Sequence, residues 1–262
     1  MIRFNHKPGL AAYVTCGDPD LATTEQIVLA AIDAGADVIE LGVPFSDPVA
    51  DGPVIQRASE RALVNKTSLT QVIEVAASLR RVRSEAGLII FSYWNPVLRF
   101  GLKRFCDALS GAGIDGALIT DLTVEESQEY SQAMRARNLA TVFLAAPTST
   151  DERLRAIAQA SSGFIYAVSR TGITGTQKQL SDDAEQLVNR IRNHTDLPVA
   201  LGFGISNADQ FASVGAFADA AVIGSAIVQI VEQSGSRAPV RVAEFIRGLR
   251  AGAGKNWALA HP

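Results

Sequence analysis

The stretch TTEQIVLAAIDAGADVIELGV, residues 23–43, decides the fold. Its first part repeats apolar residues at helical spacing up to Ile32, after an expected threonine cap at Thr23 and an acidic first turn. Gly35 is the residue type that ends a helix, because glycine adopts the left-handed conformation without strain. Residues 38–43 are then mostly apolar without strict alternation, which is typical of a strand buried on both faces. The stretch predicts a helix followed by a buried strand.

Similar apolar runs recur along the chain with helical stretches between them. The eight expected strands are Leu10–Thr15, Val38–Val43, Leu88–Tyr93, Ala117–Thr120, Thr141–Ala145, Phe164–Val168, Val199–Phe203 and Ala220–Ile223. Strands that alternate with helices imply right-handed crossovers and a parallel sheet. Eight such units within 262 residues favour an α/β fold of the (β/α)8 TIM-barrel type, formed by one domain over residues 1–262. An open parallel sheet with a similar number of strands is the alternative.

Bulk composition excludes several classes of function. The net charge of −3 gives no general attraction to nucleic acid or to an anionic membrane. No apolar run approaches the roughly 20 residues that span a bilayer, and the first residues lack the apolar core of a signal peptide. The two cysteines, Cys16 and Cys106, are expected to be small buried residues in a reducing compartment. A cytoplasmic location follows as the default.

Two long irregular stretches interrupt the pattern, Pro44–Pro53 after the second expected strand and Ser169–Gln179 after the sixth. Long loops in compact domains are usually functional or disordered. In a barrel both would lie at the carboxyl ends of strands, where active sites form.

Carboxylates are the expected acid–base groups, because His6, His194 and His261 lie in a tail, at a helix end and next to the last residue. Glu40 stands inside an apolar strand near its carboxyl end. A buried carboxyl is costly unless it is paired or holds a proton, and a raised pKa suits a general acid or base near neutral pH. A core glutamate satisfied by one hydrogen bond is the structural alternative.

Asp47 and Asp51 follow in a loop stiffened by prolines and a glycine. Aspartate beside proline or glycine usually forms turns, and this interpretation is favoured for Asp47. For Asp51 the sequence by itself leaves the choice open. No Cys, His, Asp or Glu residues gather at metal-ligand spacing.

Glycine-bearing loops follow three consecutive late strands, at residues 169–175, 202–206 and 224–226. Backbone N–H groups reach a phosphate only where no side chain blocks the approach, and a helix beginning at Gly224–Ser225 would add a partial positive charge. The three loops predict a phosphate site at the position usual for barrel enzymes, with simple turns as the alternative.

Aromatic residues stand at the ends of several expected strands: Tyr13, Tyr93, Trp94 and Tyr166. Each could line a pocket, but packing at the barrel rim is the favoured interpretation for any one of them taken alone.

The long signature ELGVPFSDPVADGPVIQ, residues 40–56, closely resembles that of the tryptophan synthase alpha chain. The resemblance covers nearly the whole chain in the right order. It continues through residues 17–19, 93–96, 121–122, 146–148, 169–175, 202–206 and 224–228.

This resemblance implies a barrel lyase that cleaves indole-3-glycerol phosphate to indole and glyceraldehyde 3-phosphate by a retro-aldol reaction in tryptophan biosynthesis. Glu40 would be the acid–base residue, and Asp51 would hydrogen-bond the indole N–H and stabilise the cationic intermediate. The resemblance also assigns the remaining site. Phosphate would be bound by Gly175, Gly204, Gly224 and Ser225, and the indole and glycerol pocket would be lined by Tyr13, Tyr93, Tyr166, Thr174 and Phe203.

The resemblance further implies a tryptophan synthase β chain as partner in an α2β2 heterotetramer, with contacts at Asp47, Pro48 and Asp121. No cofactor is expected in this chain, because pyridoxal phosphate would belong to the β chain. The sequence departs from the family in three places. The first strand begins almost at once, which should leave the lower barrel mouth less well covered; Tyr13 stands where Phe is common, and Thr123 where Pro is frequent.

Other functions remain possible from the sequence. Another phosphate-sugar barrel, an isomerase or epimerase, would share the late glycine loops but has no need of the signature at residues 40–56. A stand-alone lyase that releases free indole is barely distinguishable from a synthase subunit. A barrel kept only for binding or regulation has no chemical need for Glu40 and Asp51.

Overall fold

The strands and helices form a closed barrel. The structure is a computed structural model that describes residues 2–83, 85–168, 177–202 and 204–260, with the side chains of residues 177–181 and 254–260 left out. Among these residues eight parallel strands pair in chain order and β1 closes on β8. The strands are β1 (Gly9–Thr15), β2 (Val38–Gly42), β3 (Gly87–Ser92), β4 (Gly116–Ile119), β5 (Ala140–Ala145), β6 (Ile165–Val168), β7 (Val199–Gly202) and β8 (Ala220–Ile223). The predicted (β/α)8 barrel is confirmed, and the open sheet is excluded.

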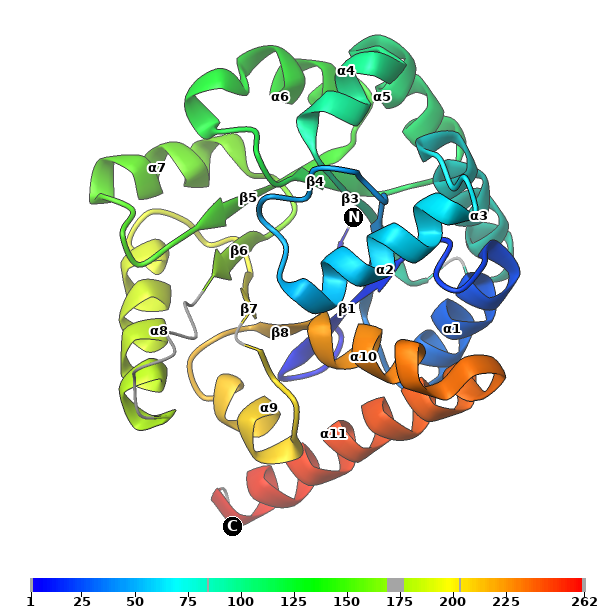
Figure 1. Cartoon of the computed structure of the whole chain (residues 1–262). Coiled ribbons are helices and arrows are strands. Elements are labelled where there is room, and N and C mark those ends of the chain that lie inside the picture. The colour runs from blue at the N-terminus through cyan, green and yellow to red at the C-terminus, as the bar shows by residue number, and fades with distance from the viewer. Residues whose placement is uncertain (1, 84, 169–176, 203, 261–262) are drawn as a thin grey trace.

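Helices surround the barrel, which Figure 1 shows end on. The elements are α1 (Leu21–Asp33), α2 (Pro53–Val64), α3 (Leu69–Val82), α4 (Trp94–Phe100), α5 (Leu102–Gly111), η1 (Val124–Glu126), α6 (Gln128–Arg135), α7 (Asp151–Ala160), α8 (Gln177–Arg192), α9 (Ala208–Val214), α10 (Ser225–Ser234), η2 (Gly235–Arg237) and α11 (Ala238–Ala260). The long helix α11 crosses the outside of α1 and α9. No described helix combines the length and the apolar character needed to cross a bilayer.

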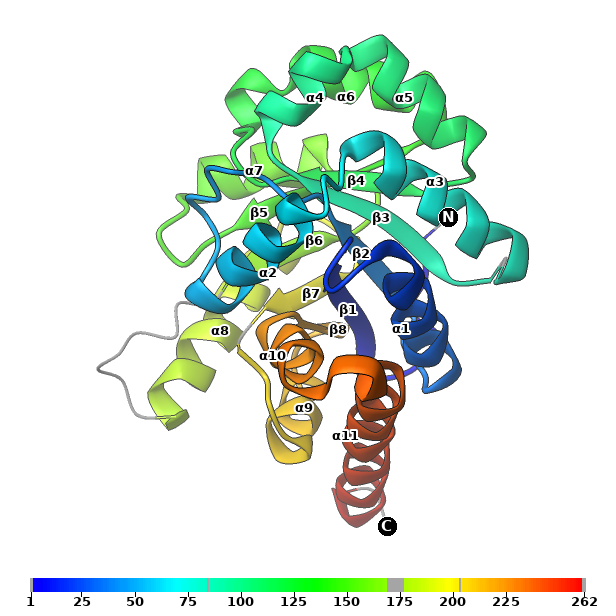
Figure 2. The same ribbon diagram turned by 45° about the vertical axis from the view of Figure 1, so that its right-hand side comes forward.

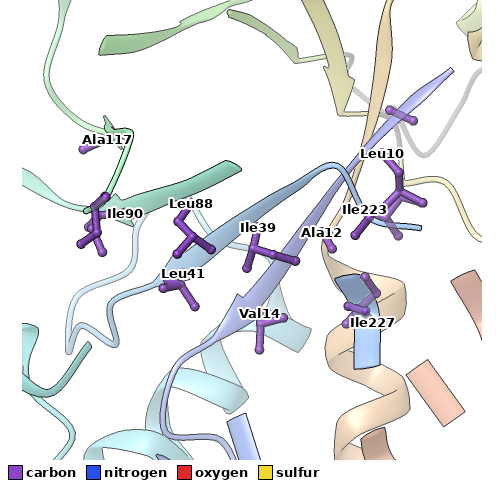
Figure 3. Packing of buried hydrophobic residues seen from close by; sticks show 14 of the residues in the cluster. Leu10, Ala12, Val14, Ile39, Leu41, Leu88, Ile90, Ala117, Ile223 and Ile227 are labelled. Carbon is purple, nitrogen blue, oxygen red and sulfur yellow. The ribbon is translucent and has the colours of Figure 1, made fainter. Parts of the chain in front are cut away.

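Alternate residues of each strand face opposite sides, which divides the core in two. On β1 and β2, Leu10, Ala12, Val14, Ile39 and Leu41 belong to the shell between strands and helices (Figure 3). The intervening residues face the barrel interior, where Ala11 and Val38 join a separate apolar cluster. Glu40 lies between Ile39 and Leu41 and is therefore directed into the barrel.

The helix before β2 begins differently from the sequence expectation. Helix α1 starts at Leu21, and Asp20 is its N-cap, with its side chain accepting from the Thr23 backbone N–H at 2.7 Å. The first turn contains no acidic residue, so the threonine cap and the acidic first turn were both wrong. Asp20 is the preferred N-cap because its carboxylate accepts a hydrogen bond from a backbone N–H of the first turn that has no partner within the helix. Gly35 follows the helix with φ +107°, as predicted.

The lower barrel mouth, at the amino ends of the strands, is covered by the N-terminal segment itself. The Phe4 ring packs edge-on against Phe164 at 5.6 Å, and Ile2 is buried in the interior cluster. Any side chain at Gly9 would collide with Phe4. The short segment before the first strand thus places two apolar side chains over the lower mouth, where less complete cover was expected.

Three aspartates just before strands close this lower end. Asp37, Asp115 and Asp219 accept the backbone N–H groups of Leu10, Leu88 and Val199, each at 2.9 Å. Each aspartate also pairs with an arginine from a covering helix: Arg250 of α11, Arg80 of α3 and Arg192 of α8. These contacts fix the amino ends of the strands and leave the opposite end to other uses.

Candidate active site

The candidate site lies inside the barrel toward the carboxyl ends of the strands. Tyr13 and Glu40 are paired neighbours on β1 and β2, and Glu40 is paired with Ile89 on β3. Phe91, Leu144 and Tyr166 also face inward from later strands and are only half-buried, unlike the buried interior residues below them. The interior is thus filled at its lower end and open toward the carboxyl ends.

The Glu40 carboxyl group is buried without a polar partner among the described residues. Its side chain is fully buried, and neither carboxyl oxygen has a hydrogen-bond partner among the described residues. Burial raises the pKa of Glu40 to about 8, because the charged form loses its hydration and gains no donor. The sequence alternative of a satisfied core glutamate finds no support in these contacts.

Asp51 lies in the loop between β2 and α2 and is only partly buried. Burial raises the pKa of Asp51 to about 6, and a hydrogen bond from the Tyr93 hydroxyl opposes that rise. The two carboxyl groups therefore differ in charge near neutral pH: Asp51 is mostly ionised while Glu40 mostly holds its proton. Two titrating groups with pKa values pushed apart by their environments are the usual arrangement for acid–base chemistry.

Tyr93 fixes the loop that carries Asp51. Its hydroxyl accepts from the Ala50 backbone N–H at 2.9 Å, and its ring packs on Phe45 at 5.1 Å. Gln56 holds the other side of the loop by donating to the Asp51 carbonyl at 2.8 Å. Tyr93 and Gln56 both belong to the sequence motifs, but only the folded loop shows what their polar atoms do.

Two glycines give the tyrosines room. A Cβ on Gly42 would lie 2.3 Å from the Tyr13 hydroxyl oxygen, and one on Gly202 would lie 2.6 Å from the Tyr166 ring. Glycine at these positions is therefore needed for ring space rather than for a turn. Gly42 was not among the predicted site residues, and the inward-facing alternation along β2 is the signal that could have found it.

The predicted phosphate positions are described in part. Gly204 has φ +61°, a conformation that favours glycine, and Gly224 is the N-cap of α10. Helix α10 begins at Ser225 as predicted, and its N-cap, Gly224, has no side chain to bond the first N–H groups. A Cβ on Gly224 would meet only Tyr13, at an ordinary 3.5 Å, so this glycine is not required by the protein's own packing. Gly175, Thr174 and Phe203 lie outside the described residues.

The predicted partner residues surround the same mouth. Asp47 is exposed and its carboxylate accepts from the Ser46 hydroxyl at 2.5 Å, in keeping with a turn role. The Pro48 carbonyl accepts from the Asp51 backbone N–H at 3.0 Å. Asp121 accepts from the backbone N–H of Trp94, the first residue of α4, at 2.6 Å. The second predicted loop ends earlier than expected, since α8 already begins at Gln177.

A network of four charged side chains joins the elements around the mouth. Arg61 of α2 donates to both carboxylate oxygens of Asp18, each at 2.8 Å, and to Glu232 of α10. Arg57, one turn earlier on α2, donates twice to Glu232 at 2.9 Å. Both views show α2 and α10 side by side (Figures 1 and 2). The helix that follows Asp51 is thereby tied to the helix that begins at Ser225.

Among the described residues, neither His6 nor His194 bonds to Glu40 or Asp51. His6 bonds to Asp37 at 2.7 Å, at the opposite end of the barrel, and is about half exposed. His194 is half-buried, and His261 lies outside the described residues. Cys16 and Cys106 are both buried and free, as predicted.

A TIM barrel with two carboxyl groups in opposite charge states at the carboxyl ends of its strands defines a barrel enzyme built for acid–base chemistry. The family model described as "Tryptophan synthase alpha chain" matches residues 2–252. The tryptophan synthase alpha chain of Solibacter usitatus is 48% identical over 97% of this chain and 95% of that protein. The alpha chain of Laribacter hongkongensis is 44% identical over 93% and 92%.

Solved structures agree with this assignment. The tryptophan synthase alpha subunit from Legionella pneumophila has a TM-score of 0.88 at 31% identity and covers 96% of this chain and 94% of its own. A tryptophan synthase complex from Pyrococcus furiosus has a TM-score of 0.85 at 34% identity, with 94% and 98% covered. The chain belongs to the tryptophan synthase alpha chain family. The expected lyase class is confirmed, and the phosphate-sugar isomerase is not supported.

Because Glu40 is buried without a polar partner among the described residues, we expect its contribution to the free energy of unfolding to depend on pH. The folded-state pKa of about 8 exceeds the ordinary glutamate value of 4.5, so the unfolded chain loses this proton first as pH rises. Glu40→Gln should therefore raise the free energy of unfolding near pH 8, by on the order of 3 kcal/mol, and change it little near pH 4. Urea denaturation at the two pH values measures the difference.

The matched control for this experiment is Glu74→Gln, which changes an exposed glutamate on α3. This variant should alter the free energy of unfolding equally at both pH values. An equal effect of pH on the Glu40→Gln and Glu74→Gln variants would mean that Glu40 is not held neutral in the folded protein.

Proposed function

We propose that Glu40 and Asp51 perform the cleavage of indole-3-glycerol phosphate to indole and glyceraldehyde 3-phosphate. The observation that carries the proposal is the fully buried Glu40 carboxyl, which faces the barrel interior without a hydrogen-bond partner among the described residues. Such a group holds a proton near neutral pH and releases it to a substrate atom placed beside it.

The proton balance follows from the two charge states. Protonated Glu40 gives its proton to the indole ring carbon that bears the glycerol chain, and the ring nitrogen becomes positively charged. Ionised Asp51 accepts a hydrogen bond from that ring N–H and stabilises the cation more than the neutral ground state. The Glu40 carboxylate then takes the proton of the adjacent glycerol hydroxyl. The carbon–carbon bond breaks, its electron pair restores the indole ring, and the aldehyde forms.

The pocket and the phosphate site complete the proposal. Tyr13, Tyr93 and Tyr166 would line the indole and glycerol pocket together with Thr174 and Phe203. The N–H groups at the start of α10 suit a phosphate, with Gly224 and Ser225 at its first turn. Gly204 and Gly175, in the glycine-bearing loops that precede it in the chain, would complete the phosphate site. The proton is returned to Glu40 within one cycle, and we propose that this chain needs no cofactor of its own.

We also propose a partner, the tryptophan synthase β chain, in an α2β2 heterotetramer with pyridoxal phosphate bound only to the β chain. The outer side of the loop at residues 44–52 presents Val49, which is 84% exposed. Beside it lies a groove of about 550 Å³ with Arg99 and Arg104 in its lining. Exposed apolar residues and arginine are typical of protein interfaces. Asp47 and Pro48 belong to this loop, and Asp121 holds the nearby start of α4.

Two further predictions from the sequence accompany this function. A single domain over residues 1–262 agrees with the closed barrel of the described residues. A cytoplasmic location agrees with a biosynthetic enzyme family and with two free buried cysteines.

Replacing either carboxyl should affect turnover in its own way. Glu40→Gln should lower kcat by at least about 10²–10⁴-fold, because no proton can be transferred. Asp51→Asn should also lower kcat strongly, because an amide accepts a hydrogen bond but cannot balance a positive charge. In the native protein kcat/KM should fall below about pH 6 and above about pH 8, as Asp51 gains and Glu40 loses a proton.

The measurement is steady-state indole release from indole-3-glycerol phosphate over a range of pH. Glu74→Gln, on the exposed face of α3, is the control and should keep native kcat. Near-native kcat in Glu40→Gln would remove Glu40 from the mechanism, and near-native kcat in Asp51→Asn would reduce Asp51 to a positioning group.

Docking on a β chain should raise the activity of this chain. A partner that binds the active form of the loop at residues 44–52 more tightly shifts the chain toward that form, and a tenfold gain needs only about 1.4 kcal/mol of differential binding. Indole release should therefore rise when a matched β chain is added to saturation. Val49→Asp should weaken the affinity for the β chain by about tenfold or more, because it buries a charge in the interface.

The matched control is Val240→Asp, which changes another exposed valine at the start of α11. It should leave the affinity for the β chain unchanged. Equal and high rates with and without the β chain would instead favour a stand-alone lyase.

A further inference from the structure

The Tyr13 hydroxyl is a polar group enclosed beside the two carboxyl groups. The Tyr13 side chain is only 4% exposed, and its ring packs edge-on against Phe91 at 5.0 Å. Its strand neighbour is Glu40, and its hydroxyl lies over Gly42, two residues beyond Glu40 on the same inner face. The hydroxyl therefore lies between Glu40 and the mouth through which a substrate reaches it.

The hydrogen of this hydroxyl has no acceptor among the described residues. The Tyr13 oxygen accepts a long hydrogen bond from the Thr15 hydroxyl at 3.4 Å, which leaves the Tyr13 proton free to be donated. Glu40 shows the complementary deficit, since neither of its oxygens receives a hydrogen bond from a described residue. An unpaired donor and an unpaired acceptor thus face the same part of the barrel interior, where leaving either one unpaired is costly.

Four acidic groups lie near Tyr13. They are Glu40 on β2, Asp51 in the loop before α2, Tyr93 after β3 and Tyr166 on β6. Apolar side chains of α2 and α10 pack around it as well. Burial, and then the charges of Asp51 and Glu40, raise the pKa of Tyr13 well above its usual range. Tyr13 consequently keeps its proton throughout the working pH range and acts as a donor to its neighbours.

Each carboxyl group carries the negative charge at a different stage of the proposed reaction. Asp51 is ionised and Glu40 neutral before the ring is protonated, and Glu40 becomes an anion once it has given up its proton. Asp51 has the Tyr93 hydroxyl as a donor, but the Glu40 anion has none among the described residues. A donor that serves Glu40 at that stage must lie close to it, and Tyr13 is its neighbour on the adjacent strand.

We propose that Tyr13 is a positioning residue whose hydroxyl donates a hydrogen bond to the Glu40 carboxylate once Glu40 has lost its proton. This inference rests on the proposed function and adds to it a donor that a phenylalanine at this position cannot supply. The Thr15 hydroxyl orients the donor, because a hydrogen bond accepted by the Tyr13 oxygen directs the Tyr13 proton away from Thr15.

The test is Tyr13→Phe, read by direct titration of the carboxyl groups in the free protein. Infrared spectra of protein with ¹³C-labelled glutamate or aspartate give the Glu40 and Asp51 signals, as differences from Glu40→Gln and Asp51→Asn. The donor to the ionised form of Glu40 is lost, so the pKa of Glu40 should rise by about one unit. The profile of kcat/KM against pH should shift upward by the same amount.

Two further variants separate this role from packing. Tyr130→Phe removes another buried phenol, whose hydroxyl donates to the Ala117 carbonyl at 3.1 Å outside the barrel interior, and it should leave both carboxyl pKa values unchanged. Thr15→Val retains Tyr13 but removes the group that orients it, and it should give a smaller shift in the same direction.

The proposal is overturned if the pKa of Glu40 does not rise in Tyr13→Phe, or if Tyr130→Phe produces an equal shift. The titration does not depend on turnover. An active Glu40→Gln variant would refute the proposed function. An unchanged pKa of Glu40 in Tyr13→Phe would refute the Tyr13 contact, so the two failures are distinguishable.

Discussion

The enclosure of an unpaired carboxyl group inside the barrel is the constraint on which the site depends. Glu40 gains no hydrogen bond and no counter-charge from the described residues. Its neutral form is therefore favoured, and this protonation state is the one that a general acid needs at neutral pH. A salt bridge to Glu40 would stabilise the fold but would hold the carboxyl ionised. The proposed chemistry thus requires that the strongest polar group in the interior remain unsatisfied.

The two ends of the barrel have different roles: the amino ends of the strands stabilise the fold, and the carboxyl ends carry the candidate active site. At the amino ends of the strands, Asp37, Asp115 and Asp219 each bind a strand N–H group and an arginine. These are satisfied ion pairs, in contrast to Glu40. Rigid lower ends allow the carboxyl ends to carry glycines, long loops and an unpaired acid without loss of the fold. This division is general for such barrels, where residues at the lower face serve stability.

Much of the fold was predictable because each strand is a short apolar run between helical patterns. The observed strand bounds differ from the predicted ones by no more than one residue, as at Gly9–Thr15 and Val38–Gly42. Local chemistry was less predictable. Thr23 was expected to cap α1, but Asp20 accepts the Thr23 N–H instead. The lower mouth was expected to be less well covered, yet Phe4 packs there against Phe164, far away in the sequence.

Site residues could be predicted from the sequence where the residue type is unusual for its position. They could not be predicted where their role depends on how neighbouring strands are paired. A glutamate in an apolar strand is visible in the sequence, and so is the signature around Asp51. The clearance that Gly42 gives to Tyr13, and the bond from the Ala50 N–H to Tyr93, depend on which side chains face inward from neighbouring strands. The contacts of Thr174, Gly175 and Phe203 lie outside the described residues, so their predicted roles stay predictions.

Helix α2 connects the parts of the site that the sequence presents separately. It begins directly after Asp51 and Gly52, and its residues Val54, Ile55 and Ala58 pack with Tyr13 and with Val228 of α10. Its arginines bind Glu232 on α10, which begins at the proposed phosphate site. A phosphate bound at the start of α10 and an indole ring beside Asp51 would therefore be held by two helices joined to each other. A reaction that needs a ring carbon placed against Glu40 requires such a fixed separation between the two ends of the substrate, since small errors in position lower the rate steeply.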